Sequence, residues 1–332
     1  MQRIFWLGVA VGVLVAGLAA PAPARAQEPQ DAQDCPDAWF PDIRCGRSGR
    51  PAGFEQPMVQ PYLFEDPFVT TNLTGVFMWQ EFPQSSALQG GELFAAAVQA
   101  RVALTDRIAL IATKDGRVWS RPDNSLIRHQ DGWMNLAAGL KYAWIQDRER
   151  NLFVSPMLRL EVSTGSSDIL EGGSGYQFLP SVAAAWGRED LHLIGDLGAR
   201  IPTDGGSYTT NLFYHLYADY QVAERFQPFA QLSGIHYIDD GDGKRKVKSL
   251  RGAPDLPLNV VQQATGSGPF EGGDLQNFGS RGVDGNDVLT AALGFHVPIN
   301  PHLTFSLAYQ RPITSRKDLL KQRVTAALRW EY

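Results

Sequence analysis

Hydrophobic and polar side chains alternate along most of the chain from about residue 72 onward. In the final segment, the apolar residues Leu328 and Trp330 alternate with the charged residues Arg329 and Glu331. Successive side chains of a strand point to opposite faces, so a period of two indicates a β-strand rather than a helix. The pattern therefore predicts strands with one apolar and one polar face.

Counting such segments gives twelve strands. Several exceed ten residues. They are longer than the roughly five or six residues usual in soluble strands and close to what a tilted membrane-spanning strand needs. The predicted strands are 72–82, 90–102, 107–115, 132–146, 152–164, 175–187, 191–200, 209–221, 226–238, 286–297, 302–311 and 321–332.

The connections between these strands alternate in length. An even strand count, alternating short and long connections, and a last strand that ends on the aromatic residue Tyr332 are typical of outer-membrane barrels. The short turns are 103–106, 147–151, 188–190, 222–225 and 298–301. The longer connections, rich in Gly, Ser and Asp, are 83–89, 116–131, 165–174, 201–208, 239–285 and 312–320.

We therefore expect an all-β fold: a closed, antiparallel, up-and-down transmembrane β-barrel with short periplasmic turns and long outer loops. Lipid offers no hydrogen-bond partners, so a sheet spans a membrane only when it closes on itself. A secreted soluble β-protein is the alternative, but in such a protein short and long connections need not alternate. Aromatic residues near strand ends suit interfacial girdles, and they are Trp79, Trp133, Trp144, Trp186, Tyr220, Trp330 and Tyr332.

The N-terminus predicts export to the outer membrane. Arg3 precedes an apolar run over residues 4–18, and Ala24-Arg25-Ala26 has the form of an A-x-A cleavage site. These features predict a signal peptide over residues 1–26, with a membrane anchor as the alternative. Residues 27–70 are rich in Pro and predict an irregular periplasmic N-terminal segment, and residues 71–332 form the barrel.

The two cysteines, Cys35 and Cys45, both lie in the N-terminal segment. An even number of cysteines in an exported chain predicts a disulfide. A metal pair or a catalytic thiol is the alternative, but the sequence has no C-x-x-C spacing and no His before His129.

Composition excludes several other classes of protein. The 332 residues are 44% hydrophobic and 20% charged, which argues against disorder and coiled coil. Removal of residues 1–26 takes away two of the 30 basic residues, so the mature net charge is 28 − 35 = −7. A nucleic-acid partner is therefore not expected, because phosphate binding needs clustered positive charge.

The polar face of the predicted strands carries charges of both signs. Basic residues outnumber acidic ones there by seven to four. One interpretation is a mildly cation-rich channel that favours anionic or hydrogen-bonding solutes; the other is a network of ion pairs that fills and stiffens the interior. The candidate lumen-lining residues are Arg101, Arg107, Lys141, Arg159, Glu161, Asp196, Arg200, His215, Asp219, Arg323, Arg329 and Glu331.

Twelve tilted strands give a backbone diameter of roughly 24 Å and a passage on the order of 10 Å, which suits small molecules. The loop 239–285 is long enough to fold inward and plug the passage. Its Asp-Asp-Gly-Asp-Gly start, residues 239–243, lacks the full spacing of an EF-hand, so a turn is the better interpretation and no metal or cofactor is expected. The basic run 244–248 would face outward, as a solvated loop or a contact for lipopolysaccharide.

The sequence carries no recognised enzyme signature. It contains neither G-x-S-x-G nor H-E-x-x-H. Outer-membrane phospholipases use a Ser–His pair on the lipid-facing wall, but the outward-facing His236 has no evident serine on an adjacent strand. We therefore expect no catalytic residues.

Three short motifs resemble a known family. Leu104-Thr105-Asp106-Arg107 at a tight turn, Gly139-Leu140-Lys141-Tyr142 in a strand and Ser163-Thr164-Gly165 at a strand end look like the outer-membrane barrel family associated with transport in a phenol-degradation pathway. The likeness spans about residues 70–332. The family commonly has Pro-Thr-Gly where this chain has Ser-Thr-Gly; residues 201–205 (Ile-Pro-Thr-Asp-Gly) are a looser match. The resemblance implies a barrel and small-molecule uptake.

The leading hypothesis is an outer-membrane barrel that passes small solutes passively. The second hypothesis is a plugged, non-conducting barrel with a structural or surface role. The expected partners are outer-membrane lipid, lipopolysaccharide, a small solute and, through the C-terminal strand, the barrel-assembly machinery.

Overall fold

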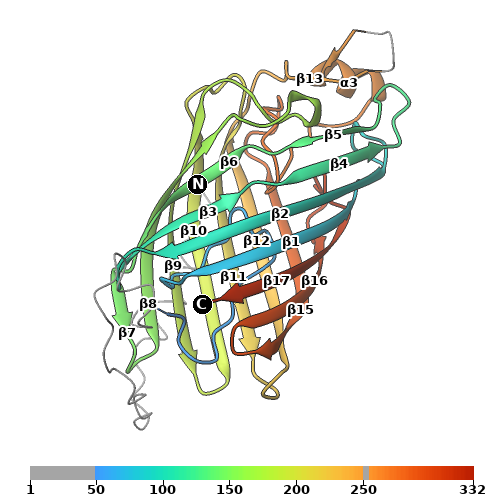
Figure 1. Cartoon of the computed structure of the whole chain (residues 1–332). Coiled ribbons are helices and arrows are strands. Elements are labelled where there is room, and N and C mark those ends of the chain that lie inside the picture. Colours follow the sequence, from blue (N-terminus) through green and yellow to red (C-terminus); the bar gives the residue numbers. More distant parts are fainter. Residues whose placement is uncertain (1–48, 250–253) are drawn as a thin grey trace. The chain divides into compact units, whose positions relative to one another are not determined.

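A computed structural model describes residues 49–249 and 254–332, and antiparallel strands dominate it (Figure 1). The strands are β1 (Asn72–Glu81), β2 (Gly91–Ala103), β3 (Ile108–Lys114), β4 (Arg117–Pro122), β5 (Gln130–Trp133), β6 (Leu136–Tyr142), β7 (Ile145–Asp147), β8 (Leu152–Val162), β9 (Tyr176–Arg188), β10 (Leu191–Pro202), β11 (Thr210–Tyr220), β12 (Gln227–Asp239), β13 (Lys246–Val247), β14 (Leu256–Pro257), β15 (Asp287–Asn300), β16 (Leu303–Pro312) and β17 (Gln322–Glu331). The helical segments are the 3₁₀ turn η2 (Ser167–Ile169) and helix α3 (Leu258–Thr265).

The main sheet closes into a barrel of 12 strands, as the alternating pattern predicts. β3 and β4 together make one strand of the wall, and β5, β6 and β7 make the next. Closure comes from β1, which pairs in antiparallel register with β2 on one side and with β17 on the other. Asn72 at the start of β1 lies opposite both Arg101 and Glu331, so the first and last strands meet along their full length.

The predicted connection 116–131 is wrong in part, because β4 and the first residues of β5 lie within it. The alternation changes phase at this point. Ala109 and Ile111 are buried before the change and Val118 is buried after it, so the inward face moves from odd to even positions. The pairing with β6 shifts register between Ala112 and Lys114, and such an irregularity moves the alternation by one position while the wall strand continues into β4.

The two faces of the wall differ as expected for a barrel in lipid. In β17, Arg323 and Thr325 are each 1% exposed, whereas Leu328 is 44% and Trp330 47% exposed. Of the aromatic residues assigned to girdles, Trp79 and Trp186 are half-buried. The exposed ones are Trp133, Trp144, Tyr220, Trp330 and Tyr332.

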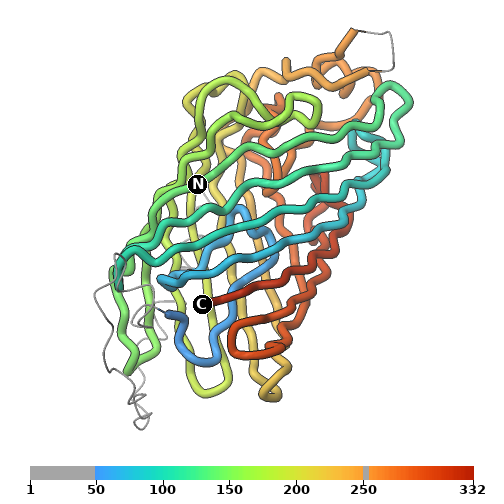
Figure 2. Tube along the Cα trace, viewed as in Figure 1, coloured from blue at the N-terminus to red at the C-terminus, as the bar shows by residue number. Residues whose placement is uncertain are grey.

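The segment before β1 differs most from expectation. Residues 49–71 contain no strand, and they lie inside the barrel (Figure 2). Its groups contact inward side chains on opposite parts of the wall: Arg101 of β2, Arg159 of β8 and Gln231 of β12. We call residues 50–70 the N-terminal insert.

The long connection between β12 and β15 also folds inward. It carries the β13–β14 hairpin and α3, and residues 266–285 then pack against the inner wall. Asp274 pairs with Arg323 of β17, and Asn277 bonds to Gln177 of β9. We call residues 254–285 the outer insert.

The predicted signal peptide, residues 1–26, and the predicted Cys35–Cys45 disulfide lie outside the described residues. Across residues 49–249 and 254–332, no helix has the length and apolar character needed to cross a membrane.

Candidate functional site

The inward face of the wall brings together ten of the twelve predicted lumen-lining residues. Each of the ten is at least nine-tenths buried. They are Arg101, Lys141, Arg159, Glu161, Asp196, Arg200, His215, Asp219, Arg323 and Arg329. Arg107 instead lies exposed in the β2–β3 turn, where it donates to the carbonyl of Ala143 at 3.1 Å, and Glu331 is half-buried beside Arg50.

An acidic pair in the N-terminal insert meets two cations of the wall. Arg101 donates to both carboxylate oxygens of Glu65, at 2.9 and 2.7 Å. Lys141 Nζ lies 2.7 Å from Glu65 and 3.2 Å from Asp66, and it also donates to the carbonyl of Phe68 at 2.9 Å. Buried charges of this kind are stable only when paired, so this cluster fixes the insert across the barrel.

Two further arginines of the wall donate hydrogen bonds to backbone carbonyls of the inserts and not to carboxylates. Arg159 donates to the carbonyls of Tyr62 and Leu63 at 2.5 and 2.9 Å. Arg200 donates to the carbonyl of Asp274 in the outer insert at 3.0 Å. The guanidinium of Arg159 therefore holds one insert and that of Arg200 the other, and carbonyls give each cation less charge compensation than a carboxylate would.

Histidine and phenylalanine rings pack together at the N-terminal insert. His215 Nδ1 lies 2.5 Å from Asp196, and its Nε2 lies 2.9 Å from Gln60 Oε1. Its ring stacks on Phe64 with centroids 4.6 Å apart and planes at 7°. Ring stacking and hydrogen bonding together orient residues 60–64 of the insert.

A second histidine contacts a phenylalanine nearer the start of the insert, with the two rings tilted at 47°. His192 Nδ1 lies 2.7 Å from Asp219, and its ring is 4.6 Å from that of Phe54. Glu55 pairs with Arg329 of β17. Wall strands on both sides of the barrel therefore hold the whole length of the insert.

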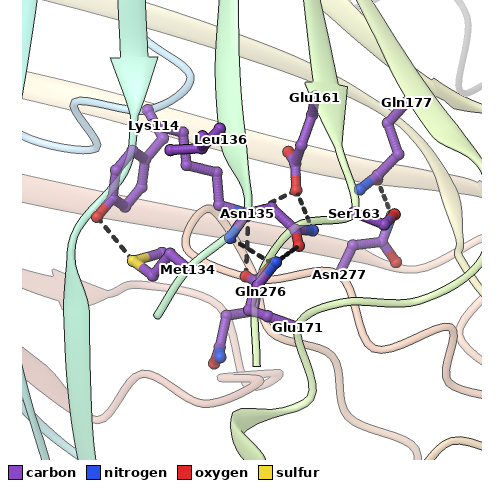
Figure 3. Close-up of polar contacts among 12 residues, drawn as sticks. Lys114, Met134, Asn135, Leu136, Glu161, Ser163, Glu171, Gln177, Gln276 and Asn277 are labelled. Carbon is purple, nitrogen blue, oxygen red and sulfur yellow. Dashed lines mark hydrogen bonds and ion pairs between the residues drawn. The ribbon is translucent and has the colours of Figure 1, made fainter. Parts of the chain in front are cut away.

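A polar network near the outer end of the wall joins the lumen to the outer loops (Figure 3). Lys114 lies between Glu161 at 2.6 Å and Glu171 at 3.0 Å. Asn135 donates its side-chain amide to Glu161 at 2.9 Å, and its backbone N–H donates to Glu171 at 3.3 Å. Of these four residues, sequence reasoning identified only Glu161.

The outer insert folds around a carboxylate. Glu271 accepts hydrogen bonds from the backbone N–H groups of Gly272 at 2.8 Å and Ser280 at 3.0 Å, and also from that of Phe278. Its own backbone N–H donates to Asp318 at 3.1 Å. Burial raises the pKa of Glu271 to about 6 and also raises the pKa of Asp318.

The outer loop residues predicted to form a turn or a basic surface make local contacts. Asp242 accepts the backbone N–H of Lys244 at 2.9 Å, which is the geometry of a turn. Lys244 and Lys248 pair with acidic neighbours, and Arg245 donates to the carbonyl of Asn277 at 2.9 Å. Within the described residues, no group of three or more His, Cys, Asp or Glu could hold a metal ion.

The residues that sequence reasoning missed are the acidic partners of the lumen cations, above all Glu65, Asp66 and Glu171. A signal for them existed. Seven basic against four acidic residues on the inward positions leaves three positive charges in excess. Buried charges need partners, so acidic residues from outside the strands were required.

Comparisons with known proteins agree with this architecture. The family model described as "Putative MetA-pathway of phenol degradation" matches residues 48–253. No curated protein matches the chain in sequence. An outer-membrane channel from Pseudomonas putida F1 is similar in structure, with a TM-score of 0.53 and 12% identity over 80% of this chain and 96% of that one.

Two further solved structures show more distant likeness. The toluene transporter TodX of Pseudomonas putida has a TM-score of 0.42 and 10% identity over 86% of this chain and 96% of that one. A KdgM porin in complex with disordered oligogalacturonate has a TM-score of 0.40 and 10% identity over 80% and 99% of the two chains. At such identities the likeness concerns the fold alone. The family match covers more than half of the chain, so the chain belongs to that family, and its barrel is that of an outer-membrane protein.

Proposed function

We propose that this member of the phenol-degradation pathway family passes small solutes passively across the outer membrane, along the barrel axis, once the N-terminal insert moves aside. The observation that carries the proposal is the way this insert is held. Wall side chains such as Arg101, Lys141 and Arg159 bind it through carboxylates and carbonyls. Water and ions can take the place of such partners once the apolar contacts of the insert, such as that of Phe64 in its cluster with Phe229, are also broken.

Displacement of the insert would also determine which solutes the passage favours. Glu65 and Asp66 would leave with the insert, while Arg101, Lys141 and Arg159 would stay on the wall. The exposed inner surface would then carry an excess of positive charge, which favours anionic or hydrogen-bonding solutes. This is a transport role, not an enzymatic one.

The second candidate is a plugged barrel that does not conduct and has a structural or surface role. The dense pairing inside the barrel favours it. Arg323, for example, binds both carboxylate oxygens of Asp274, at 2.8 and 2.9 Å, and this contact ties the outer insert to β17. Outer-membrane lipid and lipopolysaccharide would then be the main partners. In both cases we propose that the barrel-assembly machinery recognises β17, the C-terminal strand.

Single-channel recording in planar bilayers separates the two candidates. The full mature protein is compared with a variant that lacks residues 50–70 and with one that lacks residues 245–280. A channel predicts stepwise openings of the full protein, larger and longer openings without residues 50–70, and a reversal potential that reports anion preference. A full protein that never opens while a deletion variant conducts would favour the plugged barrel. A deletion variant that also fails to conduct would contradict the channel.

A further inference from the structure

Two buried arginines of the inner wall have no carboxylate partner among the described residues. Arg159 of β8 is 0% exposed and Arg200 of β10 is 1% exposed. Within the part of the chain that the structure describes, Arg159 bonds only to the carbonyls of Tyr62 and Leu63 and to the hydroxyl of Thr113. Arg200 bonds there only to carbonyls of the outer insert. Both cations are therefore held by uncharged oxygens.

The two arginines lie at one level of the wall, with a single strand between them. The register of β8 with β9 places Arg159 opposite Leu179. The register of β9 with β10 places Ile201 opposite Phe178, so Arg200 also lies beside Leu179. The two backbones are thus two strand spacings apart, about 10 Å, and the charges of the two side chains act on each other. The patch consists of two cations with an apolar side chain between them.

Several polar groups of this patch have no hydrogen-bond partner among the described residues. They are the Nε atoms of Arg159 and Arg200, the hydroxyl of Ser181 and both polar side-chain atoms of Asn211. Asn211 lies opposite Arg200 on β11, and Ser181 follows Leu179 by two residues on β9. Buried polar groups are nearly always bonded, because a group without a partner is costly. Such groups on three neighbouring strands point to a ligand that the closed barrel does not hold.

The carboxylates near the patch are already paired with other groups. The charges of Glu65 and Asp196 act on Arg159. That of Glu161 acts on Arg200. However, Glu65 is shared by two other cations of the wall, Asp196 pairs with a histidine, and Glu161 pairs with a lysine. An additional anion would therefore gain charge-assisted hydrogen bonds at Arg159 and Arg200.

The N-terminal insert covers this patch with groups that resemble such a ligand. The carbonyl oxygens of Tyr62 and Leu63 lie 2.5 and 2.9 Å from the guanidinium of Arg159. The side chain of Leu63 belongs to the same buried apolar cluster as Leu179. The insert thus presents oxygens to a cation and an apolar group to the residue between the cations. A small molecule with an apolar spacer between two carboxylates offers the same groups with negative charge added.

We propose that Arg159, Arg200 and Asn211 form a binding site for small dicarboxylates, which compete with the N-terminal insert for Arg159. One carboxylate replaces the carbonyls at Arg159. The other binds Arg200 and the amide of Asn211, and the spacer rests on Leu179. The inference rests on the proposed transport function and names the class of solute.

Arg159 is the point at which a solute gains most over the insert. A guanidinium binds a carboxylate more strongly than it binds a carbonyl. At Arg101 and Arg329, a solute would only exchange one carboxylate for another, because the insert already provides Glu65 and Glu55 there. Binding of a dicarboxylate at Arg159 therefore favours the displaced insert.

Isothermal titration calorimetry of the full mature protein in detergent tests the site directly. Succinate is the probe, and succinamide, its neutral analogue of similar shape, is the matched control ligand. We expect succinate to bind and succinamide not to bind. Arg159→Gln should weaken the binding of succinate by about tenfold or more, because a hydrogen bond between charged groups is lost. Equal binding of the two ligands, or an unchanged affinity in Arg159→Gln, would overturn the proposal.

Two further variants separate the site from general effects of charge and folding. Arg159→Lys keeps the positive charge and should bind succinate with an affinity between those of the natural protein and Arg159→Gln. Arg329→Gln removes another wall cation that holds the insert, and it should not weaken the binding of succinate. Heat-modifiable migration on gels shows which variants fold. A loss of affinity in Arg329→Gln as large as that in Arg159→Gln would contradict a specific site.

Single-channel recording distinguishes failure of the site from failure of the channel. Succinate should raise the open probability of the natural protein but not that of Arg159→Gln, and succinamide should change neither. Openings that do not respond to succinate would overturn the competition for Arg159 and leave the channel in place. A protein that binds succinate through Arg159 but never opens would support the site and contradict the channel.

Discussion

The two segments that fill the barrel are held in different ways. Charged contacts bind the N-terminal insert, with Glu65 shared by Arg101 and Lys141. The outer insert packs apolar residues such as Leu275 and Phe278 against the inner wall, in a cluster that extends to β1 and β2. Its Asp274 also pairs with Arg323. The N-terminal insert buries apolar side chains as well, since Phe54, Val59 and Phe64 pack in a cluster with wall residues. It differs in bringing three carboxylates to wall cations, namely those of Glu55, Glu65 and Asp66.

This difference bears on which segment moves. Water resolvates a charged group that loses its partner, so departure of the N-terminal insert would leave Arg101 and Lys141 solvated, although it would also expose apolar wall residues such as Phe153. Departure of the outer insert would expose apolar side chains to water, at about 25 cal/mol for each Å². We infer that the N-terminal insert is the mobile plug, because it covers four cations of the wall and the outer insert covers only Arg200 and Arg323 among the described contacts. The four are Arg101, Lys141, Arg159 and Arg329.

The largest expected effect follows from Glu65→Gln. The substitution leaves the buried cations Arg101 and Lys141 without their shared carboxylate, and loss of one partner of a buried pair costs about 3–5 kcal/mol. We expect a marked rise in open probability in single-channel recordings. Glu149→Gln, in the exposed turn before β8, is the control. An open probability equal to that of the unmodified protein would contradict the role of charge in holding the plug.

Leu275→Ala should act on the outer insert alone. Leu275 is 1% exposed within the apolar cluster, and truncation of such a side chain costs about 3 kcal/mol. External protease added to intact cells should cleave residues 254–285 faster in this variant, while open probability stays unchanged. Val260→Ala, at an exposed position on α3, controls for the loss of methyl groups. Increased conductance in Leu275→Ala would show that the two inserts do not act separately.

A smaller effect concerns pH. Burial raises the pKa of Glu271 to about 6 from 4.5, so the packed outer insert favours the neutral acid more than the opened insert does. The packed form is therefore most stable below pH 4.5 and loses about 2 kcal/mol as the pH rises through 6. Burial also raises the pKa of Asp318, which acts in the same direction.

Hydrogen exchange of residues 271–280, corrected for intrinsic rates, measures this loss. We expect protection to fall between about pH 4.5 and 7 in the natural protein. Glu271→Gln removes the main titrating group and should flatten the profile. If protection in the Glu271→Gln variant falls with pH as steeply as in the natural protein, the loss of stability arises from other titrating groups.

The smallest effect is expected at the strand ends. Thr164, Thr203 and Thr314 each follow a wall strand, and each accepts the N–H of a residue in the neighbouring strand through its hydroxyl. Thr203→Val should lower the free energy of unfolding by about 1 kcal/mol. The midpoint of heat-induced migration on gels measures this change. Thr210→Val, within β11, is the control, and an equal shift in both variants would exclude a specific role of the strand-end contact.

Much of the wall could be predicted from the sequence. Alternation identified every wall strand to within a few residues, except where a register shift between Ala112 and Lys114 moves the inward face by one position. The candidate lumen residues followed from the same parity, which explains why Arg159 and Arg323 were found. Arg107 and Glu331 were placed less well, because each lies at a strand end, where the alternation no longer determines the environment of a side chain.

The inserts could not be predicted in the same way. Residues 50–70 have no periodicity, and without it the sequence does not indicate whether a segment lies inside the barrel or outside it. The alternation of apolar and polar residues is a local property of the sequence. A sheet that lies in lipid must close on itself, so the sequence alone determined the barrel and its polar interior. The filling of that interior depends on which distant acidic and carbonyl groups reach Arg101, Lys141 and Arg159. Only the tertiary structure decided this, because such pairing depends on distance in space and leaves no repeat in the sequence.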